Sequence, residues 1–477
     1  MNATDEVNER TALLAEENRP KKPQREPTPL PKLQLFNLLL LQLAEPITSQ
    51  CIYPFLNQLV GELPITGGDP AKIGYYAGMI SSCFFATEAV FVLHWSMLSD
   101  RIGRKPVLLI GMGGLCISMV LFGLSRTLLQ LILSRCLVGM LNGNTGVMKS
   151  MMGEITDSTN MAQAFALLPI VWSCGSSIGP MIGGYLARPH DRWPNLFSGR
   201  FWVEYPYFLP CAASAAFSAY VFVHTYFFLQ EPGRKRKTRS APGTSELAGE
   251  SNDEVIDDKP LPLRAVLTRP VIISVGNYGL LALLEIAYLA IMPLFLATPI
   301  ELGGLGQTPA IIGTIMGTFG IANGIFQAAL FAKVVGRMGP KRLFMGGIAL
   351  FPILFAFFPI INSVARKQGI STSVWALIGA QLSLQVLMDC SYGCIFMFVT
   401  SAAPNKRSLG TTNGVGQLIA AIVRAIGPAL ASSLFALSIE RNWLGGNAVY
   451  VFFGIISGLG LFACNLLPAQ VWHRDDD

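Results

Sequence analysis

The chain has 477 residues, of which 52% are hydrophobic and only 13% are charged, and its mean hydropathy is +0.48. Soluble globular proteins carry about 25% charged residues, so this composition excludes that class. The net charge of +6 does not indicate nucleic-acid binding, because the positions of the basic residues have another explanation, given below.

Apolar stretches of about 20 residues recur along nearly the whole sequence, and each can cross a bilayer as a helix. The predicted fold class is therefore an all-α membrane protein embedded in a lipid bilayer. The polar segment before the first stretch does not resemble a cleaved signal peptide. Twelve transmembrane helices are predicted, at 33–56, 72–97, 105–124, 127–148, 162–187, 203–229, 270–296, 308–333, 341–362, 373–400, 411–437 and 445–469.

The longest internal polar stretch separates the spans six and six. It contains little that could pack in a core, and it is predicted to be a disordered linker. The expected organisation is an N-terminal tail, a six-helix half, the linker, a second six-helix half and a C-terminal tail, at 1–32, 33–229, 230–269, 270–469 and 470–477.

The distribution of Lys and Arg predicts the orientation. With both tails and the linker on one side, 25 Lys and Arg residues lie on that side and eight on the other, and two more lie within spans. Cytoplasmic loops carry an excess of these residues. We therefore expect both termini and the linker to be cytoplasmic.

The two halves also contain similar segments. "DRIGRKPVLLIGMGG" after the second span has a counterpart in "GRMGPKRLFMGG" after the eighth, and "GSSIGPMIGG" in the fifth span resembles "RAIGPALASS" in the eleventh. Internal repeats of this kind are typical of secondary transporters, whose substrate site lies near the midplane between the repeats.

Three motifs resemble signatures of the major facilitator superfamily. The fourth span has the Arg-x-x-x-Gly signature at Arg135 and Gly139. The loop signature between spans 2 and 3 is matched by Asp100, Arg101, Gly103, Arg104 and Lys105, with Ser96 in place of its first Gly. The antiporter signature of span 5 is matched by Gly175, Gly179, Pro180, Gly183 and Gly184. "AEPIT", "YPF" and "RAIGP" look like the drug:proton antiporter branch, similar to fungal multidrug-resistance and zinc-induced-facilitator-like members.

The resemblance implies roles for the two longer motifs. The loop cluster from Asp100 to Lys105 would be a conformational latch that holds spans 2 and 11 together when the protein faces outward. Alternatively, its basic residues only set the topology. In span 5, the glycines remove side-chain bulk and so let another helix approach closely, while Pro180 bends the helix.

Ionisable residues inside the predicted spans form a second set of candidates. Placing one at the bilayer centre costs on the order of 2.5–3.5 kcal/mol, so each is a functional candidate by default. Glu45, Arg135, Glu285 and Asp389 lie in spans 1, 4, 7 and 10, which line the central cavity in the superfamily, and Arg424 lies in span 11. The alternative for the acids is a structural ion pair inside the bundle.

Helical spacing places further polar residues on the same faces. Residues three, four or seven positions apart share a helix face. The polar stripes contain Gln42 and Ser49 beside Glu45, Asn142 beside Arg135, Gln385 and Tyr392 beside Asp389, and Gln417 beside Arg424. Glu45 is the expected proton site, with Arg135 as its partner and Asp389 as the reserve candidate. Glu88, in span 2, is expected near the domain interface and receives no firm role.

These features predict a secondary active transporter, a proton-coupled antiporter that exports a small organic solute by alternating access. The alternative is an organic-anion symporter or uniporter in which Arg135 and Arg424 bind the substrate. An enzyme is not expected, because no nucleophile–base or metal cluster is visible, and Cys390 and Cys394 are assigned to helix contacts.

The remaining expectations concern partners and location. We expect no cofactor and no metal, no nucleic acid, a small-molecule substrate exchanged for protons, and a monomer. The protein is expected in the plasma membrane or the vacuolar membrane. Glu9, Leu13 and Leu14 fit an acidic dileucine signal that a sorting adaptor could bind.

Overall fold

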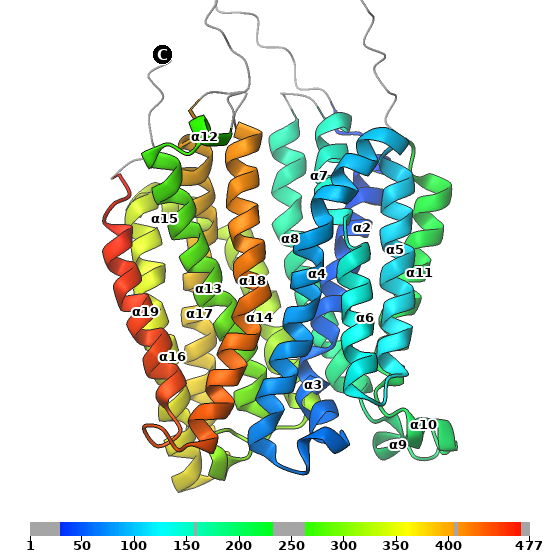
Figure 1. Ribbon diagram of the computed structural model, residues 1–477, viewed down its shortest axis with the longest axis vertical. Helices are drawn as coiled ribbons and strands as arrows, with labels where there is room; N and C mark the ends of the chain where they lie inside the picture. Colours follow the sequence, from blue (N-terminus) through cyan, green and yellow to red (C-terminus); the bar gives the residue numbers. More distant parts are fainter. Residues whose placement is uncertain (1–28, 157–159, 232–262, 405–408, 469–477) are drawn as a thin grey trace, which may run out of the picture.

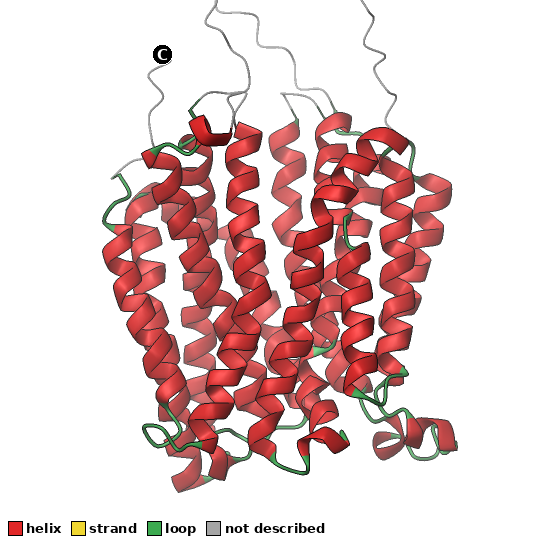
Figure 2. Ribbon diagram, viewed as in Figure 1, coloured by secondary structure: helices red, strands yellow, loops and turns green. Residues whose placement is uncertain are grey.

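The computed structural model is a bundle of long helices that run nearly side by side (Figure 1). The structure describes residues 29–156, 160–231, 263–404 and 409–468. Within these ranges the chain forms helices and loops and no strand (Figure 2). The sorting-signal residues Glu9, Leu13 and Leu14, most of the linker and most of the C-terminal tail lie outside the described residues.

The first half contains six spans, two of which are interrupted. α2 with α3 forms the first span, and α6 with α7 forms the fourth. The elements are α2 (Lys32–Cys51), α3 (Tyr53–Gly61), η1 (Pro64–Thr66), η2 (Pro70–Lys72), α4 (Ile73–Ile102), α5 (Arg104–Gly123), α6 (Leu128–Leu141), α7 (Asn144–Ile155), α8 (Met161–Leu186), α9 (Pro189–Arg192), α10 (Arg200–Glu204) and α11 (Phe208–Phe228).

The second half repeats this plan, and the described helices thus make up the twelve predicted spans. α14 and α15 together form the eighth. The elements are α12 (Leu263–Val266), α13 (Arg269–Ala297), η3 (Ile300–Leu302), α14 (Pro309–Ala329), α15 (Phe331–Met338), α16 (Pro340–Gln368), α17 (Thr372–Ser401), α18 (Leu409–Glu440) and α19 (Ala448–Cys464).

Prolines account for two departures from the predicted boundaries. The sixth span was predicted from residue 203, but α11 begins at Phe208. Pro206 disfavours helical geometry in the residue before it, so α10 ends at Glu204 and a turn separates the two helices. The first span is interrupted at Ile52, which keeps helical dihedral angles, two residues before Pro54, which has no backbone N–H to donate to the preceding turn.

The two ends of the bundle differ, and we name them by the elements that lie there. We call the end with the start of α2, the end of α11 and α12 the linker side, and the end with α9 and α10 the far side (Figure 1). On the far side a pocket of about 390 Å³ lies between α3 and the connection from α13 to α14, and its lining includes Gln58, Glu62 and Gln307.

Each half is built around its own apolar core. The buried core residues of the second half come only from that half and include Tyr288, Phe355, Phe358 and Phe453, whose rings pack against one another. The buried core residues of the first half lie between Leu35 and Leu229. The two halves therefore have separate buried cores, and Ile73 of α4 packs against both.

Small residues bring the halves together on the far side. A Cβ atom on Gly78 of α4 would lie 2.8 Å from the carbonyl oxygen of Pro428 in α18. A Cβ atom on Gly313 of α14 would lie 3.0 Å from the Cα atom of Gly184 in α8. Backbones approach this closely only where side chains are absent. We call the α4–α18 and α8–α14 contacts the far-side seal.

Three hydrogen bonds cross the far-side seal. The backbone N–H of Ala429 donates to Ser82 Oγ at 2.9 Å. The Tyr75 hydroxyl donates to a carboxylate oxygen of Glu440 at 3.0 Å. The hydroxyls of Tyr185 and Thr314 lie 3.0 Å apart and share a third bond. Polar links therefore reinforce the close packing on this side.

The same interface opens toward the linker side. On the face of α18 that packs against α4, Ala436 and Ser432 are 1% and 3% exposed. About two and three turns nearer the linker side than Ser432, Arg424 and Ala421 are half-buried, and Gln417 beyond them is exposed. Positions at these spacings share one helix face, so α4 and α18 separate as they approach the linker side.

Candidate functional site

Ionisable side chains collect where the two halves face each other. Glu285 and Arg424 lie close to the midpoints of α13 and α18, and Glu45 lies in the middle of the first span. All three are half-buried, between the far-side seal and the open linker side. Each half thus contributes ionisable residues to the site.

The fourth span is interrupted at Asn142 and Gly143, within a segment that was predicted to be one helix. α6 ends at Leu141, and the backbone of Asn142 leaves helical geometry at φ −82° and ψ 82°. Trp95 of α4 supports the interruption, because its indole N–H donates to the carbonyl oxygen of Met140 at 2.7 Å. The last carbonyl groups of a helix lack partners within the helix, and Trp95 supplies one.

Asn142 joins two carboxylates. Its side-chain nitrogen donates to Glu45 Oε1 at 3.2 Å and to Glu88 Oε1 at 2.9 Å. Glu45 comes from α2 and Glu88 from α4, so one amide connects three of the spans. Glu88 was not among the predicted cavity residues, and the structure places it beside Glu45.

Arg135, the predicted partner of Glu45, lies deeper in α6. It is 7% exposed, and its guanidinium carbon lies 5.5 Å from the ring centres of both Phe84 and Phe122. Cation–π contacts of this kind stabilise a cation away from water. Glu45 and Arg135 line the same small pocket, together with Ser49 and Asn142, while their pairing remains a prediction.

The second half places an acid, an arginine and two tyrosines together. The Tyr392 hydroxyl of α17 donates to a carboxylate oxygen of Glu285. The ring of Tyr278 meets the ring of Tyr392 edge-on, with centres 6.3 Å apart. Arg424 acts electrostatically on Glu285 and on both tyrosines, and Gln417 lies within hydrogen-bonding range of Tyr278.

Asp389 is the second acid of this half. It lies one helical turn before Tyr392 on α17, and it is half-buried. Glu285 acts on it electrostatically, and Asn323 of α14 lies nearby. Asp389 therefore faces the same polar region as Glu285, from the neighbouring helix.

Two cations act on these acids, the half-buried Arg424 and the exposed Lys149. Arg424 acts electrostatically on Glu88 as well as on Glu285, so it connects the carboxylates of both halves. Lys149 of α7 interacts electrostatically with Glu45 and Arg424. Lys149 was counted as a loop charge, because the fourth span was predicted to end at residue 148, whereas α7 continues to Ile155.

The remaining stripe residues differ in exposure. Gln42 and Gln385 are 6% and 3% exposed. The Ser49 hydroxyl donates to the carbonyl oxygen of Pro46 at 3.4 Å. Five of the predicted residues lie in the two polar clusters described above, namely Asn142, Glu45, Tyr392, Gln417 and Arg424. The other two glutamines of the stripes, Gln42 and Gln385, are buried among helices.

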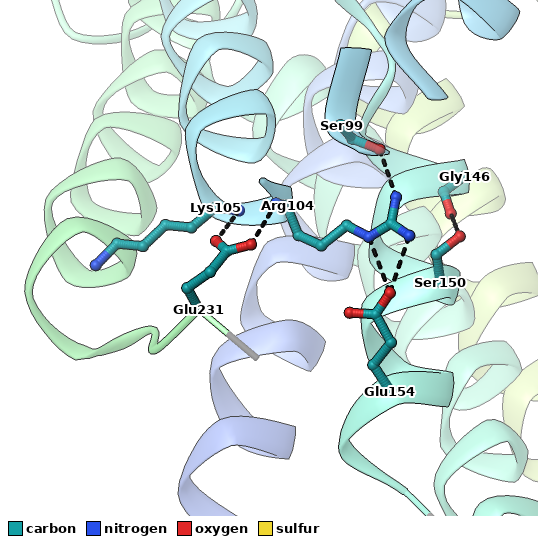
Figure 3. A network of polar contacts seen from close by, with 7 residues as sticks. All are labelled: Ser99, Arg104, Lys105, Gly146, Ser150, Glu154 and Glu231. Carbon is teal, nitrogen blue, oxygen red and sulfur yellow. Dashed lines mark hydrogen bonds and ion pairs between the residues drawn. The ribbon is translucent and has the colours of Figure 1, made fainter. Parts of the chain in front are cut away.

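The loop motif forms a network at the linker end of the first half (Figure 3). Arg104 Nη2 lies 2.9 Å from Glu154 Oε1, and Arg104 Nη1 donates to Ser99 Oγ at 2.6 Å. Lys105 Nζ donates to the carbonyl oxygen of Tyr226 at 2.8 Å. The side chain of Asp100 lies outside the described part of the chain, so its role in the latch remains a prediction.

Glu231 caps the helix that follows this motif. Its two carboxylate oxygens accept hydrogen bonds from the backbone N–H groups of Arg104 and Lys105, at 2.6 and 2.7 Å (Figure 3). A carboxylate is favoured at a helix N-terminus, where backbone N–H groups lack partners. Gly103 has φ +108° and lies against Glu231, so a side chain at Gly103 would be both strained and crowded.

The span 5 motif packs in two directions. Gly179 lies against the backbone of α2, because a Cβ atom there would meet the carbonyl oxygen of Ile47 at 2.7 Å. Gly175 and Gly183 also face α2, whereas Pro180 and Gly184 face α14 of the other half. The predicted close approach of a helix thus involves α2 within the half and α14 across the far-side seal.

A search of protein families matches residues 38–428 to the Major Facilitator Superfamily. Major facilitator-type transporter psiT2 of Psilocybe cyanescens is 30% identical, over 94% of this chain and 93% of its own. Efflux pump azaK of Aspergillus niger is 31% identical, over 90% and 86%. Protein ZINC INDUCED FACILITATOR-LIKE 1 of Arabidopsis thaliana is 26% identical, over 90% of each chain.

Solved structures share the fold. A bacterial homologue of the human lysosomal transporter Spinster, in an inward-facing and unoccupied conformation, superposes with a TM-score of 0.67 over 91% of this chain and 97% of its own, at 15% identity. The human organic anion transporter MFSD10 (TETRAN) gives a TM-score of 0.59 over 92% and 100%, at 17% identity.

Proposed function

The chain belongs to the major facilitator superfamily and is a multi-pass membrane transporter, and from this premise we propose that it is a proton-coupled antiporter that exports a small organic solute. Its relatives named as efflux and multidrug transporters favour export. The observation that carries the proposal is the carboxylate Glu45, which is half-buried in the first span, accepts a hydrogen bond from Asn142 and interacts electrostatically with Lys149.

Alternating access fits the asymmetry of the interface. The far-side seal closes one end with small residues and three hydrogen bonds, and the other end is open. A cycle needs a second state in which the linker side closes and the seal parts. Protons and substrate can drive this change only through a difference in affinity for the two states.

We propose Glu45 as the proton carrier, because it is a half-buried carboxylate in the middle of the first span and shares Asn142 with a second carboxylate, Glu88. Neutralising Glu45 leaves Lys149 with less compensating negative charge. Arg135, in the same small pocket, would lose its predicted counter-charge. The positive charge exposed in this way would favour rearrangement of the halves.

A second function, the transport of organic anions, is favoured by one observation. Lys149 and Arg424 interact across the region between the halves, and together they could bind a carboxylate substrate. The direct test of both functions is uptake into proteoliposomes under an imposed pH gradient, with a panel of organic acids, xenobiotics and metal chelates. Antiport predicts substrate movement against the proton flow, and symport predicts movement with it.

The predicted orientation can be tested with two single cysteines. Leu196, in the far-side loop between α9 and α10, is 76% exposed, and Arg264 of α12 is exposed on the linker side. In a protein whose exposed Cys174 is replaced by Ser, we expect a membrane-impermeant maleimide to label Leu196→Cys on intact cells that display the protein at their surface. Arg264→Cys should react only after permeabilisation. The reverse labelling pattern would show that the protein has the opposite orientation in the membrane.

The latch prediction concerns Asp100. Asp100→Asn keeps the size of the side chain and removes its charge, so we expect normal expression with transport several-fold slower. The measurement is the initial rate in proteoliposomes containing equal amounts of protein. A wild-type rate would show that the loop motif only sets the topology.

A further inference from the structure

We propose that the proton site of this transporter is a pair of carboxylates, Glu45 and Glu88, which share one proton beside Asn142. This inference rests on the proposed function and adds a second acid to it. It assigns a role to Glu88, which lies in α4, outside the four spans expected to line the cavity.

The geometry around Asn142 carries the inference. The amide nitrogen of Asn142 has two hydrogens, and it lies 3.2 Å from Glu45 Oε1 and 2.9 Å from Glu88 Oε1. One hydrogen can therefore serve each carboxylate while both are ionised. The two accepting oxygens can be no further apart than the two hydrogen bonds together, which is close enough for strong mutual repulsion.

Repulsion between like charges makes the pair a natural proton acceptor. Two carboxylates that share a site titrate as one unit, and the first proton relieves the repulsion between them. That proton comes from water at the open linker side and converts one carboxylate to a carboxylic acid. The other carboxylate stays ionised and keeps its hydrogen bond from Asn142.

Cations from three other helices act on the pair or lie beside it. Arg424 of α18 acts on Glu88, and Lys149 of α7 acts on Glu45. Arg135 of α6 lines the small pocket beside Glu45. With both acids ionised, two negative charges face these three cations, and the uptake of one proton makes the net charge of the group more positive by one. Other titratable groups on these helices or bonded to them include Cys51 of α2, Cys83 of α4 and, toward the far side, Tyr75 of α4 with Glu440 of α18.

The position of Asn142 connects the pair to the interruption of the fourth span. Asn142 is the residue at which α6 ends, and Trp95 holds the freed carbonyl group of Met140. Trp95 and Glu88 both belong to α4, which packs against α18 of the other half in the far-side seal. A change in the charge of the pair therefore acts on the helix that joins the interruption to the seal.

The test measures the shared proton directly and needs no substrate. Infrared difference spectra of the purified, reconstituted protein, recorded between mildly acidic and mildly alkaline buffer, detect the C=O stretch of protonated carboxyl groups. Wild-type protein should show a band that is absent from both Glu45→Gln and Glu88→Gln. Each variant keeps one acid, which lies beside Asn142 and a cation. Because the second carboxylate is missing, no repulsion between like charges favours protonation of the remaining acid.

Two further variants complete the experiment. Glu88→Asp retains a carboxylate and should retain a shifted band. Glu301→Gln, which changes an exposed acid in η3 on the far side, should leave the spectrum unchanged. The double variant Glu45→Gln/Glu88→Gln should lose no more signal than either single variant, because the two acids act as one unit.

The outcomes separate this inference from the proposed function. Loss of the band in Glu45→Gln alone would make Glu45 the sole carrier, which would overturn the shared site and leave proton coupling at Glu45 intact. An unchanged band in both variants would overturn both the shared site and proton coupling at Glu45. Far-ultraviolet circular dichroism shows whether each variant is folded, and Glu88→Asp provides the test if Glu88→Gln is not.

Discussion

We expect Glu45→Gln to abolish transport driven by a pH gradient while the exchange of substrate for substrate continues. Glutamine keeps the hydrogen-bonding shape of the side chain but cannot take up a proton, so the variant resembles the protonated state permanently. Counterflow needs only binding and rearrangement of the halves, and gradient-driven transport also needs a change in protonation. The measurement compares both activities in the same proteoliposomes, with the substrate that the panel identifies.

The controls distinguish the two halves. Glu301→Gln replaces an exposed acid in η3 and should transport like the wild type in both assays. Asp389→Asn tests the reserve candidate on α17, which faces Glu285. If Glu45→Gln responds normally to the gradient and Asp389→Asn does not, the proton site lies in the second half.

The second large effect is expected at Gly313, in the far-side seal. Gly313→Leu would push the side chain into the carbonyl oxygen of Pro180 and the Cα atom of Gly184. Overpacking of this kind costs about 1–3 kcal/mol, and each 1.4 kcal/mol shifts an equilibrium tenfold. We therefore expect the sealed state to lose most of its population and gradient-driven transport to fall to a tenth or less, by an order-of-magnitude argument.

A cysteine reporter checks the mechanism of this loss. Asn57 of α3 lines the far-side pocket and is 5% exposed, so Asn57→Cys should react with an impermeant maleimide faster when Gly313→Leu opens the seal. Gly454→Leu is the matched control, because an added Cβ atom on Gly454 of α19 meets nothing within 4 Å. Equal reactivity in the two variants would show that Gly313 does not hold the seal.

Features that depend on hydrophobic length were predictable from this sequence. In the described part of the chain ten spans are long and apolar enough to cross a membrane, whereas the helices of the interrupted fourth span and α19 are shorter. The twelve-helix fold follows from these properties. Boundaries near prolines were less predictable, because Pro206 separates α10 from α11 although the surrounding sequence remains apolar.

The interruption of the fourth span was missed although a local signal exists. Asn142, Gly143 and Asn144 form an Asn-Gly-Asn sequence of the kind that marks turns. It lies inside an apolar segment, and hydropathy favours one continuous helix there. Lys149 was likewise assigned to a loop, because the predicted fourth span ended one residue before it.

The position of Glu88 could not be obtained from one sequence. Periodicity shows which residues share a face of α4, and it does not show how that face is turned toward other helices. Packing between helices sets the rotation of α4, through contacts such as those of Gly78 with Pro428 and Trp95 with Met140. Residues distant in sequence determine these contacts, and they bring Glu88 to Asn142.

The separate apolar cores have a consequence for how the protein is made. The buried core residues of the first half end at Leu229, and every one of them has been synthesised before the ribosome reaches the second half. Domains generally fold as units, with the N-terminal one first during synthesis. The first six spans can therefore complete their packing in the membrane while the rest of the chain is still being translated. The second half, once folded, then needs only to dock against the first through the glycine-lined far-side seal.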